Sequence, residues 1–247
     1  MSRLTWNKGI EKVEPHLVKI LTPSGTGTGF LCFYNEAKTL CGIATAAHVV
    51  DKANYWKEPI RIRNYKNSNE LFLKEDDRII FSNRKLDTAV VIIKNVGIEL
   101  PSNTISIISE GRHRKVGDDI GWVGFPSVSP ENLCFFNGRV SYWSENNRAY
   151  LVDGVAINGV SGGPAFYTTA KGIIVVGSVS AYLPNVVGST PGLSMITDVQ
   201  HYLQVIKEIK DFEEAKKKAP TPAEIIDKPE KGTEKTNIWF KHLTFFI

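Results

Sequence analysis

Three short segments of the chain carry residue types that suit nucleophilic catalysis. They are TAAHVV with His48, LDTAVVII with Asp87, and NGVSGGPAF with Ser161. A serine hydroxyl is a weak nucleophile at neutral pH, and a histidine can take its proton because the imidazole pKa lies near neutrality. A carboxylate beside that histidine fixes its tautomer and stabilises the imidazolium that forms. Together the three residues predict attack of the Ser161 hydroxyl on a carbonyl carbon.

The glycines beside Ser161 extend this prediction. Without a Cβ in the way, successive backbone N–H groups can turn toward one point and hold a developing oxyanion. Each segment alone is a weak signal, since a lone histidine is more often structural, an aspartate before a strand is more often a turn residue, and Gly-rich turns with serine are common. The order His48, Asp87, Ser161 along the chain is more specific, because it differs between unrelated folds that use the same three residue types.

Short strands must position these residues. Runs rich in β-branched and aromatic residues recur between Gly, Pro, Asn and Asp turns, and they include HLVKILT, TGFLCFY, IRIRNY, RIIFS, TAVVIIK, IGWVGF, GRVSYWS, RAYLVDG, GIIVVGSVSAY and GLSMIT. Their lengths and number predict an all-β fold, a sandwich or barrels, rather than βαβ units. One helix is predicted over residues 198–217, where apolar residues repeat at helical spacing after an N-cap at Thr197 or Asp198.

Composition narrows the possible classes of protein. A chain of 247 residues with 42% hydrophobic content can bury a sizeable core, and its formal net charge of +4 is modest. No stripe of Lys and Arg with interleaved aromatic residues is visible, so no nucleic-acid partner is expected. We interpret the basic run GRHRK (111–115) as a solvated loop rather than a ligand site. The remaining histidines are expected to be surface or packing residues: His16, His113, His201 and His242.

The three cysteines do not predict a disulfide framework, which would need an even and denser set. We expect Cys32, Cys41 and Cys134 to be small buried hydrophobic residues. A single bridge between Cys32 and Cys41, facing each other across a hairpin, is the alternative. No Cys-x-x-Cys pair or histidine cluster has the spacing of zinc ligands, so we expect no metal and no other cofactor.

The ends of the chain differ from its middle. The N-terminal segment lacks the apolar core of a secretory signal, and no stretch approaches the ~20 apolar residues of a membrane span. A cytoplasmic protein that does not contact a membrane is therefore expected. Residues 211–247 begin with a Lys-, Glu- and Pro-rich stretch that predicts a charged linker and tail. The apolar end IWFKHLTFFI is either docked on the fold or a partner, or a fraying terminus.

The three segments resemble the triad segments of the trypsin-like, chymotrypsin-fold serine peptidases, most closely those of the bacterial HtrA-like branch. The similarity covers residues 14–210 and includes SGTGTGF, VGDDIGWVGFPS, LVDGVAINGVSGGPAF, GSVSAY and PGLSMITDVQHYLQVI. It implies two six-stranded antiparallel Greek-key β-barrels, at about 14–105 and 106–197, and a closing helix at about 198–210. HtrA relatives carry PDZ domains after the protease, whereas residues 211–247 are too few and too charged to form one.

The resemblance also implies roles for individual residues. Ser161 would be the nucleophile, His48 the general base and then acid, and Asp87 the residue that orients His48. The backbone N–H groups of Gly159 and Ser161 would form the oxyanion hole. No metal or cofactor takes part in this chemistry.

Substrate contacts follow from the same resemblance. Ser180 and its neighbours Val179 and Ala181 would pair with the backbone of a protein or peptide bound in extended form. Val155 would lie at the base of the specificity pocket, which favours a small or medium apolar residue before the scissile bond and disfavours Lys, Arg and Glu. Val160 stands where activated digestive proteases carry an aspartate that pairs with a new N-terminus, so no activating cleavage is expected.

Three functions fit these observations. The first is an active serine endopeptidase that works through an acyl-enzyme. The second is a non-catalytic protein-binding module that retains the fold. The third is a protease effector that an activating protein partner switches on, with residues 211–247 as an interaction segment.

Overall fold

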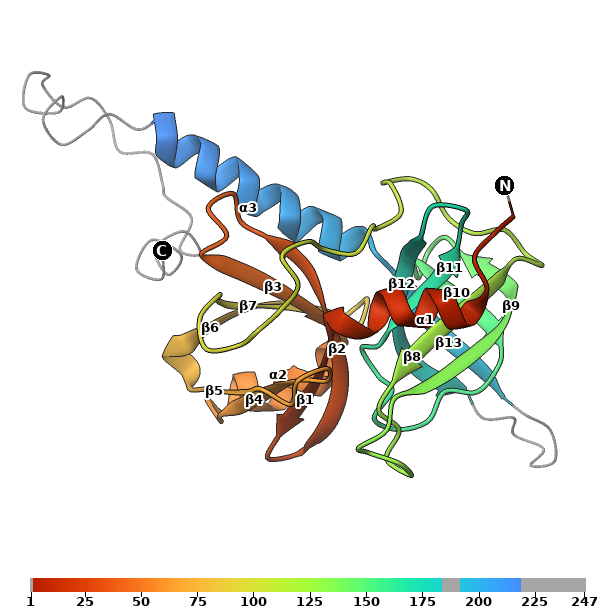
Figure 1. Ribbon diagram of the computed structural model, residues 1–247, viewed down its shortest axis with the longest axis horizontal. Helices are drawn as coiled ribbons and strands as arrows, with labels where there is room; N and C mark the ends of the chain where they lie inside the picture. The colour runs from red at the N-terminus through yellow and green to blue at the C-terminus, as the bar shows by residue number, and fades with distance from the viewer. Residues whose placement is uncertain (1, 184–191, 219–247) are drawn as a thin grey trace, which may run out of the picture.

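The computed structural model describes residues 2–183 and 192–218 of the chain. Two β-structured halves lie side by side (Figure 1), and a long C-terminal helix crosses the first of them. The first half contains α1 (Trp6–Val13), a 3-10 turn (Glu14–His16), β1 (Leu17–Thr22), β2 (Gly25–Tyr34), β3 (Leu40–Thr45), α2 (Ala47–Tyr55), β4 (Ile60–Asn64), β5 (Glu70–Leu73), a 3-10 turn (Glu75–Asp77), β6 (Arg78–Asn83) and β7 (Thr88–Lys94). The second half contains β8 (Asp119–Gly124), β9 (Cys134–Ser144), β10 (Ala149–Asp153), β11 (Pro164–Thr168), β12 (Ile173–Leu183), β13 (Leu193–Asp198) and α3 (Gln200–Lys218).

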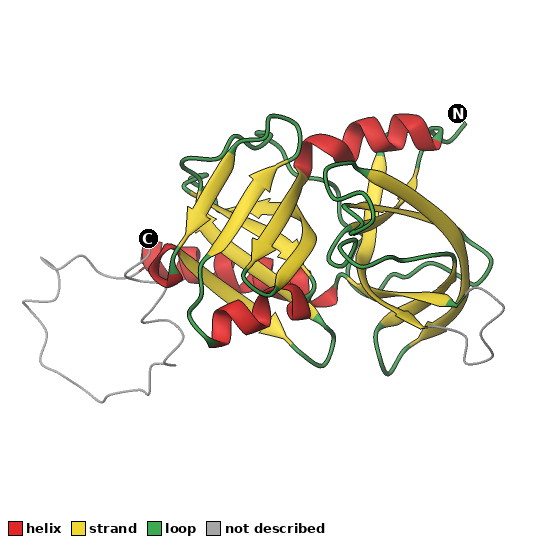
Figure 2. Ribbon diagram, turned by 90° about the horizontal axis from the view of Figure 1, so that it is seen from below, coloured by secondary structure: helices red, strands yellow, loops and turns green. Residues whose placement is uncertain are grey.

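The second half confirms the predicted six-stranded barrel. Its strands close in the order β10-β13-β12-β11-β8-β9, and all these pairings are antiparallel. Figure 2 shows this ring of strands from below, beside the strands of the first half. Alternate side chains of such a barrel point inward, and Trp122, Tyr150 and Phe166 are fully buried.

The first half differs from the predicted six-stranded barrel. It is an antiparallel sheet of seven strands in the order β5-β4-β1-β2-β3-β7-β6, and hydrogen bonds do not close it into a ring. The strand that sequence analysis missed is β5, which pairs with β4 from Ile60↔Leu73 to Arg63↔Glu70. Its four residues, ELFL, are too short to show a strand pattern, and the pairing with β4 is what orders them.

Sequence analysis also missed two helices, α1 and α2. In α1, Trp6 lies on the second barrel, with its ring centroid 5.3 Å from that of Phe135 and 5.9 Å from that of Phe166. Gly9 of the same helix faces Thr168, whose methyl carbon would lie 2.9 Å from an added Cβ. The N-terminal helix therefore packs against the half of the molecule that is most distant from it in sequence (Figure 1).

Helix α3 ends one residue beyond the helix predicted over 198–217 from its apolar repeat, and well beyond the closing helix at about 198–210 that the resemblance implies. The segment 211–218, predicted to be linker, continues the helix to Lys218. Lys207 and Asp211 pair one turn apart at 2.7 Å, and Glu213 accepts a 3.0 Å hydrogen bond from Asn35 of the β2–β3 hairpin. These contacts stabilise a polar helical end that its composition alone does not predict. The remainder of the predicted tail lies outside the described residues.

All three cysteines are free. Cys32 and Cys41 are buried as predicted, whereas Cys134 is only partly buried. The alternative bridge does not form, because a shift in register between β2 and β3 leaves Cys32 in the hydrophobic cluster shared with the second barrel and Cys41 in the core of the first half. The thiol of Cys32 instead lies 3.2 Å from the Gly42 carbonyl oxygen. No helix in the described part of the chain is both long and apolar enough to span a membrane.

Candidate active site

His48 and Asp87 form the best-defined pair of the predicted site. His48 lies in the first turn of α2, directly after β3, and Asp87 directly precedes β7, which is paired with β3. The distance from His48 Nδ1 is 2.8 Å to Asp87 Oδ2 and 3.0 Å to Oδ1. The backbone N–H of His48 donates to Oδ1 as well, at 3.0 Å. The carboxylate thus fixes both the ring and the backbone of the histidine.

Asp87 adopts an unusual backbone conformation, with φ of +51°. Aspartate tolerates this left-handed region better than most residues, because its short polar side chain can hydrogen-bond locally. The turn before β7 therefore aims the carboxylate back across the end of β3. Conformations of this kind often occur at functional sites.

A third residue, Ser180, completes the surroundings of the carboxylate. Its hydroxyl donates a 2.6 Å hydrogen bond to Asp87 Oδ2, and it is 4% exposed. A β-bulge in β12, where the pairing with β13 shifts between Val179 and Ala181, turns the Ser180 side chain toward the first half of the molecule. Sequence analysis placed Ser180 at the substrate backbone and missed this side-chain role. The signal was present in the alternating serines of GSVSAY, since polar residues on one face of an apolar strand need buried partners.

These contacts set the protonation of the pair. Burial alone would raise the pKa of Asp87, but hydrogen bonds from His48 and Ser180 outweigh burial and hold that pKa below its ordinary value. The hydrogen bond to Asp87 raises the pKa of His48 above its ordinary value, against the opposing effect of burial. Asp87 is therefore ionised at neutral pH, and its charge favours the imidazolium form of His48.

Ser161 and His48 line one cavity of about 200 Å³ at the junction of the two halves. The cavity is further lined by Thr22, Ser24, Gly25, Thr26, Val49, Asn158 and Gly159. Within the described residues the hydroxyl of Ser161 forms no hydrogen bond, including none to His48. Catalytic hydrogen bonds of this kind are often long or poorly aligned until substrate binds.

The loop before Ser161 has its carbonyl groups turned into the protein. The Asn158 carbonyl accepts a 2.6 Å hydrogen bond from the N–H of Ser127, and the Gly159 carbonyl accepts one of 2.8 Å from the Thr28 hydroxyl. Because a peptide unit is planar and trans, the N–H of Gly159 points away from Ser127. In the part of the chain that the structure describes, neither the N–H of Gly159 nor that of Ser161 has a protein acceptor.

Gly159 and Gly162 make this loop conformation possible. Gly159 has φ of +93°, and an added Cβ would lie 2.3 Å from the Phe125 carbonyl oxygen. Gly162 has φ of +82°, and an added Cβ would lie 2.2 Å from the Thr28 carbonyl oxygen. A side chain at either position would combine a disfavoured backbone with a collision against fixed backbone atoms.

Thr28 of β2 holds the loop from the opposite half. It is fully buried, its N–H donates to the Ser161 carbonyl at 2.8 Å, and its hydroxyl donates to the Gly159 carbonyl. The same hydroxyl accepts from the N–H of Phe125 at 3.1 Å. Val160 is also fully buried and lies in the hydrophobic core. Hydrogen bonds and apolar packing thus order this loop. At Val160, where activated digestive proteases carry an aspartate that pairs with a new N-terminus, the chain has a buried apolar side chain instead.

The other residues predicted to contact substrate differ in whether their backbone groups are free to bind it. Val179 is buried, and both its backbone groups are engaged, its N–H with the Gly163 carbonyl and its carbonyl with the Gly162 N–H. Ser180 and Ala181 therefore remain as the predicted contacts for a substrate backbone. Val155 is 42% exposed and is not among the lining residues of the cavity that holds Ser161.

Comparison with known proteins identifies the family of the chain. Residues 27–177 match the family model described as the trypsin-like peptidase domain. The chain belongs to the trypsin-like peptidase family. No match was found among curated protein sequences. The predicted resemblance is confirmed, and the trypsin-like match includes Thr28 and all three residues of the predicted triad.

Several solved structures share the fold. The serine endoprotease from Yersinia pestis is similar with a TM-score of 0.62 and 18% identity, over 85% of this chain and 68% of that one. Deg5 is similar with a TM-score of 0.58 and 18% identity, over 79% of this chain and 88% of that one. The inactive form of a serine-to-alanine mutant of Rv3671c from M. tuberculosis gives a TM-score of 0.57 and 16% identity, over 85% and 95% of the two chains. At these identities the similarity shows the chymotrypsin-like fold.

Proposed function

We propose that this trypsin-like peptidase is a serine endopeptidase that cleaves proteins through an acyl-enzyme. Ser161 is the nucleophile, His48 the general base and acid, and Asp87 the orienting carboxylate. The observation that carries the proposal is the placement of the His48–Asp87 pair beside Ser161 in one cavity, next to two backbone N–H groups that have no acceptor among the described residues.

The proposed reaction uses each group in turn. Ser161 Oγ attacks the scissile carbonyl carbon while His48 Nε2 takes the hydroxyl proton. The N–H groups of Gly159 and Ser161 bind the oxyanion of the tetrahedral intermediate, and one such donor lowers the barrier by about 3 kcal/mol. His48 then gives its proton to the leaving amine, and the acyl-enzyme forms. Water attacks the acyl group with His48 as base, and the second product leaves with a new carboxylate.

The proposed substrate is an extended polypeptide segment. Its backbone lies along Ser180 and Ala181 of β12, just beyond Ser178, where the pairing of β12 with β11 ends. We keep the expectation of a small or medium apolar residue before the scissile bond, which rests on the apolar character of Val155 and not on a pocket wall, because Val155 is 42% exposed. Cleavage after Lys or Arg would need a buried carboxylate in the specificity pocket, because an apolar environment does not solvate a cationic side chain.

The test is hydrolysis of casein or a fluorogenic peptide, combined with fluorophosphonate labelling. The wild-type chain should turn over substrate and be labelled, and Ser161→Ala should lose both. Ser102→Ala, which changes an exposed serine, is the matched control and should behave as wild type. Labelling without turnover would favour the partner-activated effector. A folded wild-type chain that shows neither would favour the non-catalytic module and contradict the proposal.

A further inference from the structure

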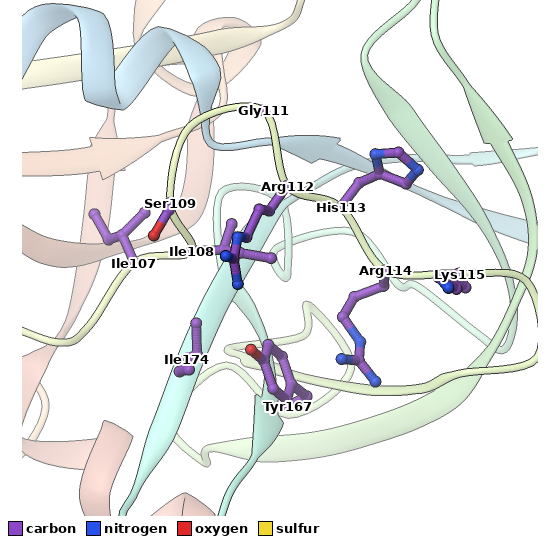
Figure 3. A pocket seen from close by; sticks show the side chains of 10 residues that line it. All are labelled: Ile107, Ile108, Ser109, Gly111, Arg112, His113, Arg114, Lys115, Tyr167 and Ile174. Carbon is purple, nitrogen blue, oxygen red and sulfur yellow. The ribbon is translucent and has the colours of Figure 1, made fainter.

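A second cavity lies on the segment that joins the two halves of the molecule. Residues 95–118 connect β7 to β8, and the middle of this linker runs along β12 (Figure 3). Val175 N–H donates to the Ser106 carbonyl, and Ile108 N–H donates to the Val175 carbonyl, both at 2.8 Å. The linker and strands β11 and β12 enclose a space of about 440 Å³. This volume is within the usual range for small-molecule sites.

The wall of this cavity is cationic. It contains Arg112, Arg114, Lys115 and His113, and no carboxylate is among its lining residues in the described part of the chain. Figure 3 shows the Arg112 and Arg114 side chains directed toward Tyr167, while His113 points away from them. The ring of His113 is stacked on that of Trp143, with centroids 4.7 Å apart. The three remaining cations therefore define the charge of the cavity.

Nearby acidic residues neutralise this charge only in part. Asp118 pairs with Arg114 at 3.0 Å, which leaves Arg112 and Lys115 without an ion pair among the described residues. Glu110 forms no ion pair with a cavity cation among the described residues and is not one of the lining residues. Glu145, on the far side of His113, pairs with Arg148 and also accepts a hydrogen bond from the Trp143 indole. The balance near the cavity is positive.

Arg114 is held in place as a preformed part of the wall. Its guanidinium carbon lies 4.2 Å from the centroid of the Tyr167 ring, and its side chain is 16% exposed. Its Nε is buried and has no hydrogen-bond partner. Because this Nε is out of reach of solvent, an anion in the cavity would bind the terminal N–H groups of the guanidinium.

The floor of the cavity is apolar and consists of Ile107, Ile108 and Ile174. A ligand that fits has a compact anionic group for the arginines and an apolar or aromatic part for the floor. Guanidinium groups bind phosphate oxygens with paired hydrogen bonds, which makes phosphate the anion that suits two arginines and a lysine best. We propose that this cavity binds a phosphate-bearing small molecule.

The proposed site is distinct from the catalytic cavity, but strand β12 connects it to the serine that hydrogen-bonds Asp87. Val175, which is bonded to the linker, and Ser180, which is bonded to Asp87, both belong to β12. Sequence analysis took the run GRHRK as a solvated loop, because Tyr167 and Ile174, which complete the cavity, are remote from it in the chain. The packing of the linker on β12 is what brings the cations and the floor together.

Isothermal titration calorimetry of the full chain tests this inference, with inorganic pyrophosphate, ATP and adenosine as probes at constant ionic strength. Pyrophosphate and ATP should bind saturably, ATP more tightly because its base can cover the apolar floor, and adenosine should not bind. Arg112→Gln and Lys115→Gln should each weaken both phosphate probes about tenfold or more. Both side chains are exposed, so the variants should fold. Arg114 is unsuitable for this purpose, because its pairing with Asp118 also supports the loop.

Lys52→Gln and Lys85→Gln are matched controls, since each removes one exposed cation from the first half of the molecule. Three outcomes would overturn the proposal: no saturable binding of either phosphate probe, equal weakening by the linker and control variants, or adenosine binding as tightly as ATP. The titration involves no turnover. A failure here is thus distinguishable from a failure of the proposed peptidase activity.

Discussion

The Ser180 hydroxyl and the Nδ1 of His48 contact the same oxygen of Asp87, Oδ2, at 2.6 and 2.8 Å. The carboxylate is therefore held between the two halves of the molecule, with the histidine on one side and strand β12 on the other. This relationship makes Ser180 a positioning residue in the proposed mechanism. It also joins the fold of the second barrel to the orientation of a histidine in the first half.

Ser180→Ala should lower kcat/KM about tenfold or more, because it removes a charge-assisted hydrogen bond from Asp87. The loss should appear mainly in kcat, since the side chain contacts the carboxylate and not the substrate. Ser178→Ala is the matched control, because this fully buried serine lies two residues away and bonds to the Tyr202 hydroxyl instead. It should lower the melting temperature without a comparable loss of kcat. Equal kinetic effects of the two variants would remove Ser180 from the mechanism.

The pH profile of kcat/KM should report His48. A general base must be unprotonated, so activity falls as the pH drops through the pKa of His48 in the free enzyme. The hydrogen bond to Asp87 raises that pKa above 6.5, and the acidic inflection should therefore lie above pH 6.5.

Asp87→Asn should shift this inflection to lower pH, because the substitution removes the charge that stabilises the imidazolium. It should also lower kcat by about 10⁴-fold, since the amide does not hold the required tautomer. The measurement is kcat/KM of the wild-type chain and of Asp87→Asn as a function of pH between pH 5 and 9. An inflection that stays in place in the variant would assign it to another group.

Thr28→Val should impair the oxyanion loop. The substitution keeps the shape of the side chain but leaves the Gly159 carbonyl and the Phe125 N–H without their buried partner. Each unpaired group costs about 1–3 kcal/mol of stability. We expect a lower melting temperature and a lower kcat with little change in KM. Thr28→Ser retains the hydroxyl and should recover most of kcat, and failure of this rescue would argue that Thr28 acts through packing alone.

Gly162→Ala should destabilise the fold and abolish labelling by fluorophosphonate. Its left-handed backbone alone costs a non-glycine residue about 1–2 kcal/mol, and the collision with the Thr28 carbonyl adds to this. Gly172→Ala is the control, because no heavy atom lies within 4 Å of its added Cβ. Thermal denaturation and labelling of both variants provide the comparison. A Gly162→Ala chain that is stable and labelled would contradict the described loop geometry.

The sequence singles out His48, Asp87 and Ser161 because their types and their order along the chain can be interpreted without the fold. The structure brings His48 and Asp87 within hydrogen-bond distance and places His48 and Ser161 on one cavity. The sequence does not predict the side-chain role of Ser180, which is 93 positions from Asp87 and depends on a β-bulge. The role of Thr28 is hidden for the same reason, since 131 positions separate it from Gly159. Local sequence patterns identify residues that could act in catalysis. Hydrogen bonds between the two halves of the molecule, which the sequence does not show, determine which other residues hold them in place.

The prediction of strands and helices is limited in the same way, because some of them depend on contacts with distant parts of the chain. The strands of the second barrel are predictable because long apolar runs alternate with turn residues. Strand β5 is not, since it is a short segment ordered by its pairing with β4. The end of α3 carries two conflicting signals, a helical apolar repeat and a linker-like composition from residue 211, and contacts with neighbouring elements favour the helix. The hydrogen bond from Asn35 to Glu213, for example, joins a hairpin to a helix turn that lies near the other end of the chain.

Helix α1 is made first during synthesis, yet its binding surface belongs to strands that are made late. Trp6 has no partner until Phe135 and Phe166 have left the ribosome and the second barrel has formed around them. The residues around the proposed nucleophile come from the same late part of the chain. A nascent chain therefore acquires the packing partners of α1 and the segment around Ser161 within the same late stretch of synthesis.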